Sequence, residues 1–237
     1  MLKLFTKIFF LTMKLYKYSN PNQLAKGLCK KVEDQLSTSI KKNNRAVLVL
    51  SGGHTPNLYL PKLFSSQLIW EKIHITFSDE RWVPPQHVDS NEGLIKKHLP
   101  KIISKKVNIT SLWENQKNPS LVIDNINKRL SLLPSPYDVA ILGMGEDGHF
   151  ASLFPNMGET RNSSSHCLCT FDIDKKPRIS LSPKSLLSIK HIHLCVIGKE
   201  KMNTFKRAMM TGNIDSMPIR LLLKNKVNKR LTVHYST

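Results

Sequence analysis

Apolar positions follow two different periods along this chain. Near the start they recur at every fourth residue, which predicts one face of an amphipathic helix, at Leu24, Leu28, Val32, Leu36 and Ile40. Asn20 is suited to cap this helix, and Pro21 fits its first turn, where a missing N–H costs nothing. The next apolar run, Ala46–Leu50, is short and uninterrupted, which predicts a strand buried on both faces.

The same change of period repeats along the rest of the chain. Short apolar runs predict further strands at Ile73–Phe77, Val139–Leu142, 178–181, 193–197 and 231–235. Between them, helices are predicted after the caps Thr55 and Ser90 and over 120–133 and 200–210. This alternation is typical of an α/β fold with a doubly wound, mostly parallel sheet flanked by helices, of the Rossmann-like type. We expect residues 16–237 to form one such domain.

The polar segments that carry the most chemistry each follow a predicted strand directly. They are residues 51–56, 78–85 and 143–155. In doubly wound sheets, ligands bind beyond the carboxyl ends of the strands, where the strand order reverses. We therefore predict that the three segments meet at one edge of the sheet and form a single site.

The segment at 51–56 reads SGGHTP and turns the chain from a strand into a helix. Glycines there let the backbone approach an anion, and the start of the helix offers unpaired N–H groups to it. The same pattern is typical of a tight turn with an ordinary cap. Phosphate binding is therefore one of two interpretations for Ser51, Gly52, Gly53 and Thr55.

The segment at 78–85 reads SDERWVPP and places two carboxylates and a guanidinium before a stiff Pro-Pro exit. Arg81 carries a planar fork of donors that suits an oxyanion or a carboxylate. An ion pair between Asp79 and Arg81 that only stabilises a loop explains the pattern as well. The residues by themselves leave both interpretations open.

The segment at 143–149 reads GMGEDGH and contains the spacing G-x-G-x-x-G. It lies past the middle of the chain, and no acidic residue is well placed for a ribose contact, which disfavours a dinucleotide site. His149 instead indicates acid–base chemistry, because an imidazole with a pKa of about 6.5 accepts a proton from water at neutral pH. Asp147 is close enough in sequence to orient this ring.

Charge widens the range of partners. Lys and Arg number 36 against 17 Asp and Glu, a formal net charge of +19, which suits nucleic acid, an anionic membrane surface or small anionic substrates. The lysines are scattered in pairs except for a dense run at 224–230, and no zinc-finger, RRM or aromatic–basic pattern accompanies them. We expect a solvated surface without a nucleic-acid or membrane partner; a nucleic-acid-binding module is the alternative from another class.

Cysteine usage and the first residues bear on the compartment. The four cysteines do not form a disulfide framework in a chain this long, so we expect buried free thiols, at Cys29, Cys167, Cys169 and Cys195. Residues 1–15 lack the long apolar run and small-residue cleavage site of a signal peptide and are too short to span a bilayer. We expect an N-terminal extension, with Met13 as an alternative start, and a cytoplasmic protein.

Five motifs in register resemble the 6-phosphogluconolactonase family. They are SGGHTP, FSDERWVPP with a downstream DSN, LGMGEDGHFASLFP, PRISLSP and GKEK. The resemblance implies hydrolysis of 6-phospho-D-glucono-1,5-lactone to 6-phospho-D-gluconate, a step of the oxidative pentose phosphate pathway. The glucosamine-6-phosphate isomerase/deaminases, related in fold, are the nearest alternative, but FASLFP after His149 lacks the glutamate that those enzymes carry there.

The resemblance also implies roles at the reacting end of the substrate. His149 would take a proton from the attacking water and return it to the departing ring oxygen. Asp147 would orient His149 or its loop. Arg81, held by Asp79, would fix the lactone or its developing oxyanion.

At the other end of the substrate, the resemblance implies a clamp for a dianion. The turn at 51–55 would hold the phosphate together with Arg178 and Lys201. No metal or cofactor is implied. The expected partner is the phosphorylated sugar lactone alone, bound by a monomer or a weak homo-oligomer.

Overall fold

A central parallel sheet organises the protein, whose structure is a computed structural model that describes residues 13–158, 164–224 and 229–237. The strand order is β1-β10-β9-β6-β2-β3-β5, and each of these neighbouring pairs is parallel. The bounds are β1 Lys14–Lys17, β2 Ala46–Leu50, β3 Ile73–Phe77, β5 Asn108–Ile109, β6 Val139–Leu142, β9 His191–Ile197 and β10 Leu231–Ser236. The predicted doubly wound, mostly parallel α/β fold is confirmed.

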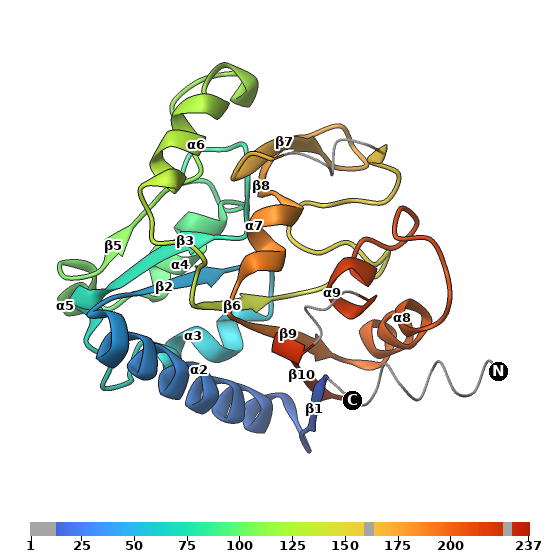
Figure 1. Cartoon of the computed structure of the whole chain (residues 1–237), viewed down its shortest axis with the longest axis horizontal. Coiled ribbons are helices and arrows are strands. Elements are labelled where there is room, and N and C mark those ends of the chain that lie inside the picture. The colour runs from blue at the N-terminus through green and yellow to red at the C-terminus, as the bar shows by residue number, and fades with distance from the viewer. Residues whose placement is uncertain (1–12, 159–163, 225–228) are drawn as a thin grey trace.

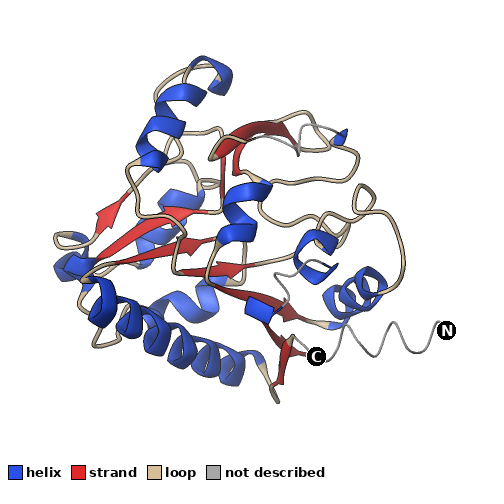
Figure 2. Ribbon diagram, in the orientation of Figure 1, coloured by secondary structure: helices blue, strands red, loops and turns tan. Residues whose placement is uncertain are grey.

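Helices cover both faces of this sheet. They are α2 Pro21–Asn43, α3 Pro56–Leu63, α4 Asn91–His98, α5 Lys101–Ser104, α6 Ile123–Ser131, α7 Pro183–Ser188, α8 Lys199–Met209 and α9 Arg220–Lys224, with 3-10 turns at Trp70–Lys72 and Pro119–Leu121. Figures 1 and 2 show α2 and α3 below the sheet and α7 above it. In the described part of the chain, no helix combines the length and apolar character needed to cross a membrane.

The helix α2 forms as its local signals predict. Asn20 Oδ1 accepts a hydrogen bond of 3.0 Å from the backbone N–H of Gln23, and Pro21 occupies the first turn. The predicted apolar stripe is buried along its length. The helix ends at Asn44, whose left-handed backbone (φ 60°) donates its N–H to the Ile40 carbonyl.

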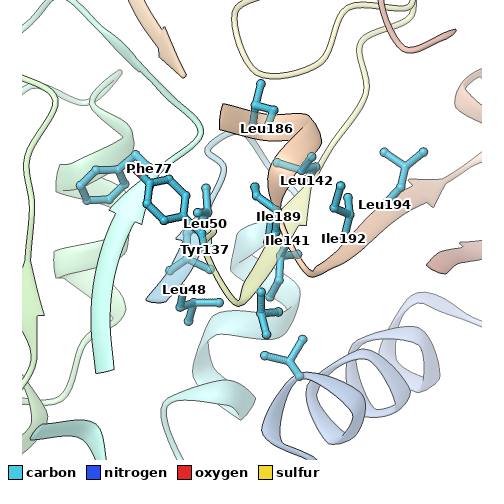
Figure 3. Close-up of a cluster of buried hydrophobic side chains, with 14 of the residues drawn as sticks. Leu48, Leu50, Phe77, Tyr137, Ile141, Leu142, Leu186, Ile189, Ile192 and Leu194 are labelled. Carbon is cyan, nitrogen blue, oxygen red and sulfur yellow. The ribbon is translucent and has the colours of Figure 1, made fainter. Parts of the chain in front are cut away.

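The core lies on both sides of the central strands β2 and β6. Every residue of both strands is buried, as the uninterrupted apolar runs predict. Figure 3 shows Leu186 of α7 and Ile189 just beyond it packed beside the β6 residues Ile141 and Leu142. Burial of this kind stabilises by about 25 cal/mol per Å² of apolar surface, so the core fixes the two strands whose ends carry the site.

The strand order reverses between β2 and β6. From β2 the chain proceeds outward to β3 and β5, and from β6 it proceeds outward in the other direction to β9 and β10. Crevices at such reversals, beyond the carboxyl ends of the strands, are the usual ligand sites of doubly wound sheets. In this protein the strands end at Leu50 and Leu142, so the SGGHTP and GMGEDGH segments open into that crevice.

A second, antiparallel sheet corrects two expectations. Its order is β4-β8-β7, with β4 at Asp79–Arg81, β8 at Pro177–Leu181 and β7 at Cys167–Phe171. We expected Asp79 and Arg81 to lie on a loop and 178–181 to join the main sheet. A three-residue charged strand has no apolar alternation, so only its pairing with β8 reveals it.

The thiols and the chain start also differ in detail from expectation. All four cysteines are free; three are buried, while Cys169 on β7 is half-buried. Lys14 and Leu15, which we assigned to an N-terminal extension, belong to β1 and pair with Thr232 and Val233 of β10. Met13 is buried in the core, and residues 1–12 of the predicted extension lie outside the described residues.

Candidate active site

A small cavity opens where the three predicted segments meet, which confirms that they converge at one edge of the sheet. Its volume is about 190 Å³, below the range of about 300–1,000 Å³ typical of drug-sized ligands, so it suits a small metabolite. The predicted site residues that line it are Ser51, Gly52, Gly53, Thr55, Asp79, Arg81, His149 and Lys201.

A histidine–carboxylate pair lies at the cavity: His149 lines it, and Asp147 contacts His149 without lining the cavity itself. His149 Nδ1 lies 2.6 Å from Asp147 Oδ1, which also accepts the backbone N–H of His149 at 3.0 Å. Burial raises the pKa of the Asp147 carboxyl, but the hydrogen bonds from His149 lower it more, so it lies below its usual range. A carboxylate only accepts hydrogen bonds, so Nδ1 is the donor in this contact, and a neutral ring in this tautomer has its lone pair on Nε2.

Two glycines of the 143–149 segment have local structural causes. A Cβ atom at Gly145 would lie 2.3 Å from Cε1 and Nδ1 of His149, which leaves no space for any side chain there. Gly148 adopts a left-handed conformation (φ 86°), which favours glycine. Gly145 is therefore required by the packing of the imidazole and Gly148 by its backbone conformation, whereas a Cβ atom at Gly143 would meet no atom within 4 Å.

Contacts from distant parts of the chain hold this loop in place. Thr204 Oγ1 on α8 donates to the Glu146 carbonyl at 2.9 Å, and Arg207 Nη2 donates to the same oxygen at 3.1 Å. The backbone N–H of Ile219 bonds to the Gly148 carbonyl at 2.8 Å. The sequence carries no signal for these supports, because each lies more than fifty residues downstream of the loop.

The carboxylate of Asp79 binds serines rather than Arg81. Ser78 Oγ donates to Asp79 Oδ1 at 2.6 Å, and Ser152 Oγ donates to Oδ2 at 2.7 Å. Ser152 lies three residues after His149 in the sequence. Its bond to Asp79 therefore connects β4 to the segment at 143–152, called the histidine loop below. Arg81 instead donates from Nη1 to the backbone carbonyl of Asp89. The expectation that Asp79 holds Arg81 is replaced by this arrangement.

Arg178 lies beside the cavity rather than on its wall. It faces Arg81 across the β4–β8 pair and forms an ion pair of 2.6 Å with Asp172. Burial raises the pKa of the Asp172 carboxyl, but hydrogen bonds from Arg178 and the Lys176 backbone lower it more. Arg178 and Arg81 together line a second cavity of about 330 Å³. The structure thus separates Arg178 from the turn with which we grouped it.

Groups that favour an anion also line the first cavity. The turn at 51–55 passes through Gly53 in a left-handed conformation (φ 86°) and leads into α3. Thr55 forms no side-chain capping bond, contrary to expectation, and lines the cavity instead. Lys201 lies in the first turn of α8 and faces the same space. A helix start and an ammonium group together favour an anion there.

Two further polar residues complete the site and were not singled out from the sequence. Asn91, the first residue of α4, lines the cavity. Glu80 is fully buried behind it and accepts backbone N–H groups of Asn91, Glu92 and Arg81 at 2.7, 2.7 and 2.8 Å. Burial raises the pKa of Glu80 to about 7, although these backbone donors lower it in part.

One cavity of this α/β protein thus combines a helix-start turn, nearby cations and a histidine–carboxylate pair, groups that suit a small anionic substrate and acid–base chemistry. The chain belongs to the family described as glucosamine-6-phosphate isomerases/6-phosphogluconolactonase, whose model matches residues 19–232. It is 34% identical over 222 residues to a 6-phosphogluconolactonase of Pseudomonas putida, with 91% of each chain covered.

Two further comparisons agree with this membership. A 6-phosphogluconolactonase of Xylella fastidiosa strain 9a5c is 33% identical over 230 residues, which cover 93% of this chain and 95% of that one. The crystal structure of a 6-phosphogluconolactonase from Shewanella baltica superposes with a TM-score of 0.90 at 30% identity, covering 95% of this chain and 98% of that one. The expected family resemblance is confirmed.

Proposed function

We propose that this chain hydrolyses 6-phospho-D-glucono-1,5-lactone to 6-phospho-D-gluconate in the pentose phosphate pathway. The relatives named above are lactonases of this type, and the match extends over nine-tenths of the chain. The single observation that carries the proposal is the 2.6 Å contact between His149 and Asp147 at the wall of a cavity that cations also line.

The chemistry follows from the free nitrogen of His149. Nε2 takes a proton from water as the water oxygen forms a bond to C1 of the lactone. The tetrahedral intermediate then breaks the bond between C1 and the ring oxygen, and His149 returns the proton to that oxygen. One water is consumed and one hydroxy acid is formed. General acid–base help of this kind contributes about 10²–10⁴ in rate.

Different groups stabilise the charges at the two ends of the substrate. The Arg81 guanidinium, fixed by the Asp89 carbonyl, stabilises the oxyanion that develops at C1. The turn at 51–55 and Lys201 hold the phosphate, so binding energy far from C1 positions the reacting carbon. Arg178 is bound to Asp172, so we assign the phosphate to the turn and Lys201 and give Arg178 no direct contact.

The test is a lactone-disappearance assay that is faster than spontaneous hydrolysis. We expect His149→Ala to lose at least about a hundredfold in kcat, because the water then has no base. His98→Ala is the matched control. His98 bonds to Asn57 outside the cavity, so this variant should retain full activity. Near-normal turnover in His149→Ala would remove the mechanism, and a wild-type protein without lactonase activity would remove the function.

The same preparation should be assayed for two alternatives. Release of ammonia from glucosamine-6-phosphate would favour the deaminase branch of the family. Retention on nucleic acid with a steep salt dependence would favour a nucleic-acid partner.

Of the basic run at 224–230, residues 225–228 lie outside the described part. Lys224 donates to the Gly212 carbonyl at 2.9 Å and Arg230 to carbonyls of residues 187–189, which supports a structural use.

Other parts of the proposal concern state and location. We infer that the phosphorylated lactone is the partner, without nucleic acid, and that the enzyme acts as a monomer or a weak homo-oligomer. Four free cysteines support a reducing compartment and hence the cytoplasm. Size-exclusion chromatography coupled to light scattering tests the oligomeric state directly.

A further inference from the structure

The turn at 51–55, called the phosphate turn below, is in unusually close contact with the start of α4. A Cβ atom at Gly52 would lie 1.6 Å from Asn91 Oδ1 and 2.2 Å from Asn91 Cγ. Distances under 3.0 Å do not occur for real Cβ atoms, so any side chain at Gly52 would displace Asn91 or the turn. The backbone of Gly52 has an ordinary φ, so glycine is required there by this contact and not by conformation.

Asn91 cannot move aside without breaking bonds. Its Nδ2 donates to the Asp79 carbonyl at 2.8 Å, and its backbone N–H donates to Glu80 Oε1 at 2.7 Å. Only 1% of the residue is exposed. Two anchors on β4 therefore fix both the backbone and the side-chain amide of Asn91.

The oxygen of the same amide has an unusual environment. It is buried, and no described residue donates a hydrogen bond to Asn91 Oδ1. The Cα–H bond of Gly52 lies along the direction of the missing Cβ and therefore points at this oxygen, as a weak donor does. A buried acceptor left without a stronger partner carries a cost, which indicates that its position serves another purpose.

We infer that Asn91 is a positioning residue that sets the phosphate turn relative to the reacting end of the substrate. Asn91 touches Gly52 on one side and the Asp79 carbonyl on the other, and Asp79 in turn bonds to Ser152 of the histidine loop. The lactone ring and its short C6 arm limit the distance between the phosphate and C1, so both ends bind well together only over a narrow range of spacings between these segments. The inference rests on the proposed function, because it requires that the turn holds the phosphate.

A double-mutant cycle tests this coupling. Gly52→Ala should raise KM for the phosphorylated lactone by at least about thirtyfold, with kcat changed far less, because the new methyl group displaces the turn. Asn91→Ala should raise KM by about fivefold, through a less constrained turn. In the double variant Asn91 Oδ1 is gone, so adding Gly52→Ala to Asn91→Ala should raise KM by less than about a further threefold. The expected coupling exceeds tenfold, or about 1.4 kcal/mol, within the range seen for contacting residues.

A second glycine of the same cavity provides the matched control. Gly143 also lines the cavity, and a Cβ atom there would meet no atom within 4 Å. Effects of Gly143→Ala and Asn91→Ala should therefore multiply without coupling. If Gly52→Ala does not fold alone, a folded double variant still supports the inference, since removal of Asn91 Oδ1 then rescues it.

The outcomes separate the two proposals. Independent effects of Gly52→Ala and Asn91→Ala, or a loss confined to kcat, would overturn the positioning role while the wild-type lactonase activity stands. An unfolded double variant would overturn it as well. The Kd of 6-phosphogluconate, measured by calorimetry, should show the same coupling between Gly52→Ala and Asn91→Ala as KM does. A general loss of stability would not produce this coupling in Kd. Absence of wild-type activity would instead remove the proposed function.

Discussion

Two sites in this molecule use histidine in contrasting surroundings, one at the cavity and one buried in the sheet. At the cavity, the His149 side chain is 33% exposed and its partner is the carboxylate of Asp147. In the sheet, His193 and His234 are 0% exposed and bond to each other at 2.9 Å. A carboxylate and access to water make an imidazole a base, whereas neutral partners and burial make it a structural bridge.

The buried cluster extends across several elements. His193 Nε2 contacts Gln35 Oε1 of α2 at 2.7 Å, and His234 Nδ1 contacts the Tyr18 hydroxyl at 3.0 Å. Burial lowers the pKa of His234 to about 3 and that of His193 well below its usual range. Both rings therefore stay neutral while they join α2 to β9 and β10.

Asp147→Asn should produce the largest effect of the variants that test this comparison. It gives His149 the kind of neutral amide partner that His193 already has in Gln35. We expect kcat for the lactone to fall about a hundredfold or more, since an amide neither holds the tautomer nor stabilises the imidazolium. The melting temperature should stay near the wild-type value, because the Asp147 side chain is 48% exposed. Asp34→Asn, at an exposed partner of Lys30, is the control. Unchanged turnover in Asp147→Asn would contradict the assigned role.

His193→Ala addresses the other side of the comparison. We expect the free energy of unfolding in urea to fall by about 2 kcal/mol, because Gln35 Oε1 and His234 Nε2 lose a buried partner. The kcat of the folded variant should match the wild type. His191→Ala, at a half-exposed position of the same strand, should change stability by less than about 1 kcal/mol. A loss of kcat with stability intact would show that the two clusters are not separate.

Taken per pH unit, the pH dependence of stability is the smallest of these expected effects. Below pH about 6.5 the unfolded chain protonates His234 while the folded state excludes that proton until pH about 3, so stability is lost as pH falls through this window. The slope for one such group is about 1.4 kcal/mol per pH unit.

Glu80 has the opposite sign and must be separated from His234. Its pKa rises to about 7 on folding, so its contribution is present below pH about 4.5 and is lost as pH rises towards 7. The informative quantity is therefore the difference in slope between wild type and His234→Leu, from urea denaturation at several pH values. Parallel slopes would mean that His234 is not held neutral.

Local signals predicted most of the fold. The stripe of apolar residues and the Asn20 cap identified α2, and the buried runs identified β2, β3 and β6. These elements depend on residues a few positions apart, so their signals survive without tertiary context. The His149 segment was found for the same reason, because its glycines, carboxylate and imidazole are consecutive.

Short strands with distant partners escaped prediction. The edge strand β1 has the sequence KLYK and pairs with β10 at the opposite end of the chain. The strand β4 consists of three charged residues and pairs with β8 about one hundred residues later. Neither has a period to detect, because long-range pairing alone makes them strands.

Sequence was sufficient for the class of fold, the edge at which the cavity opens and the identity of the candidate base. Folding decided which partner each charged side chain has: Arg81 holds the Asp89 carbonyl, Arg178 pairs with Asp172, and Asn91 rests on Gly52. Periods and caps arise from neighbours within a few residues, whereas the partner of a long side chain depends on which distant segments the sheet brings within 3 Å of it.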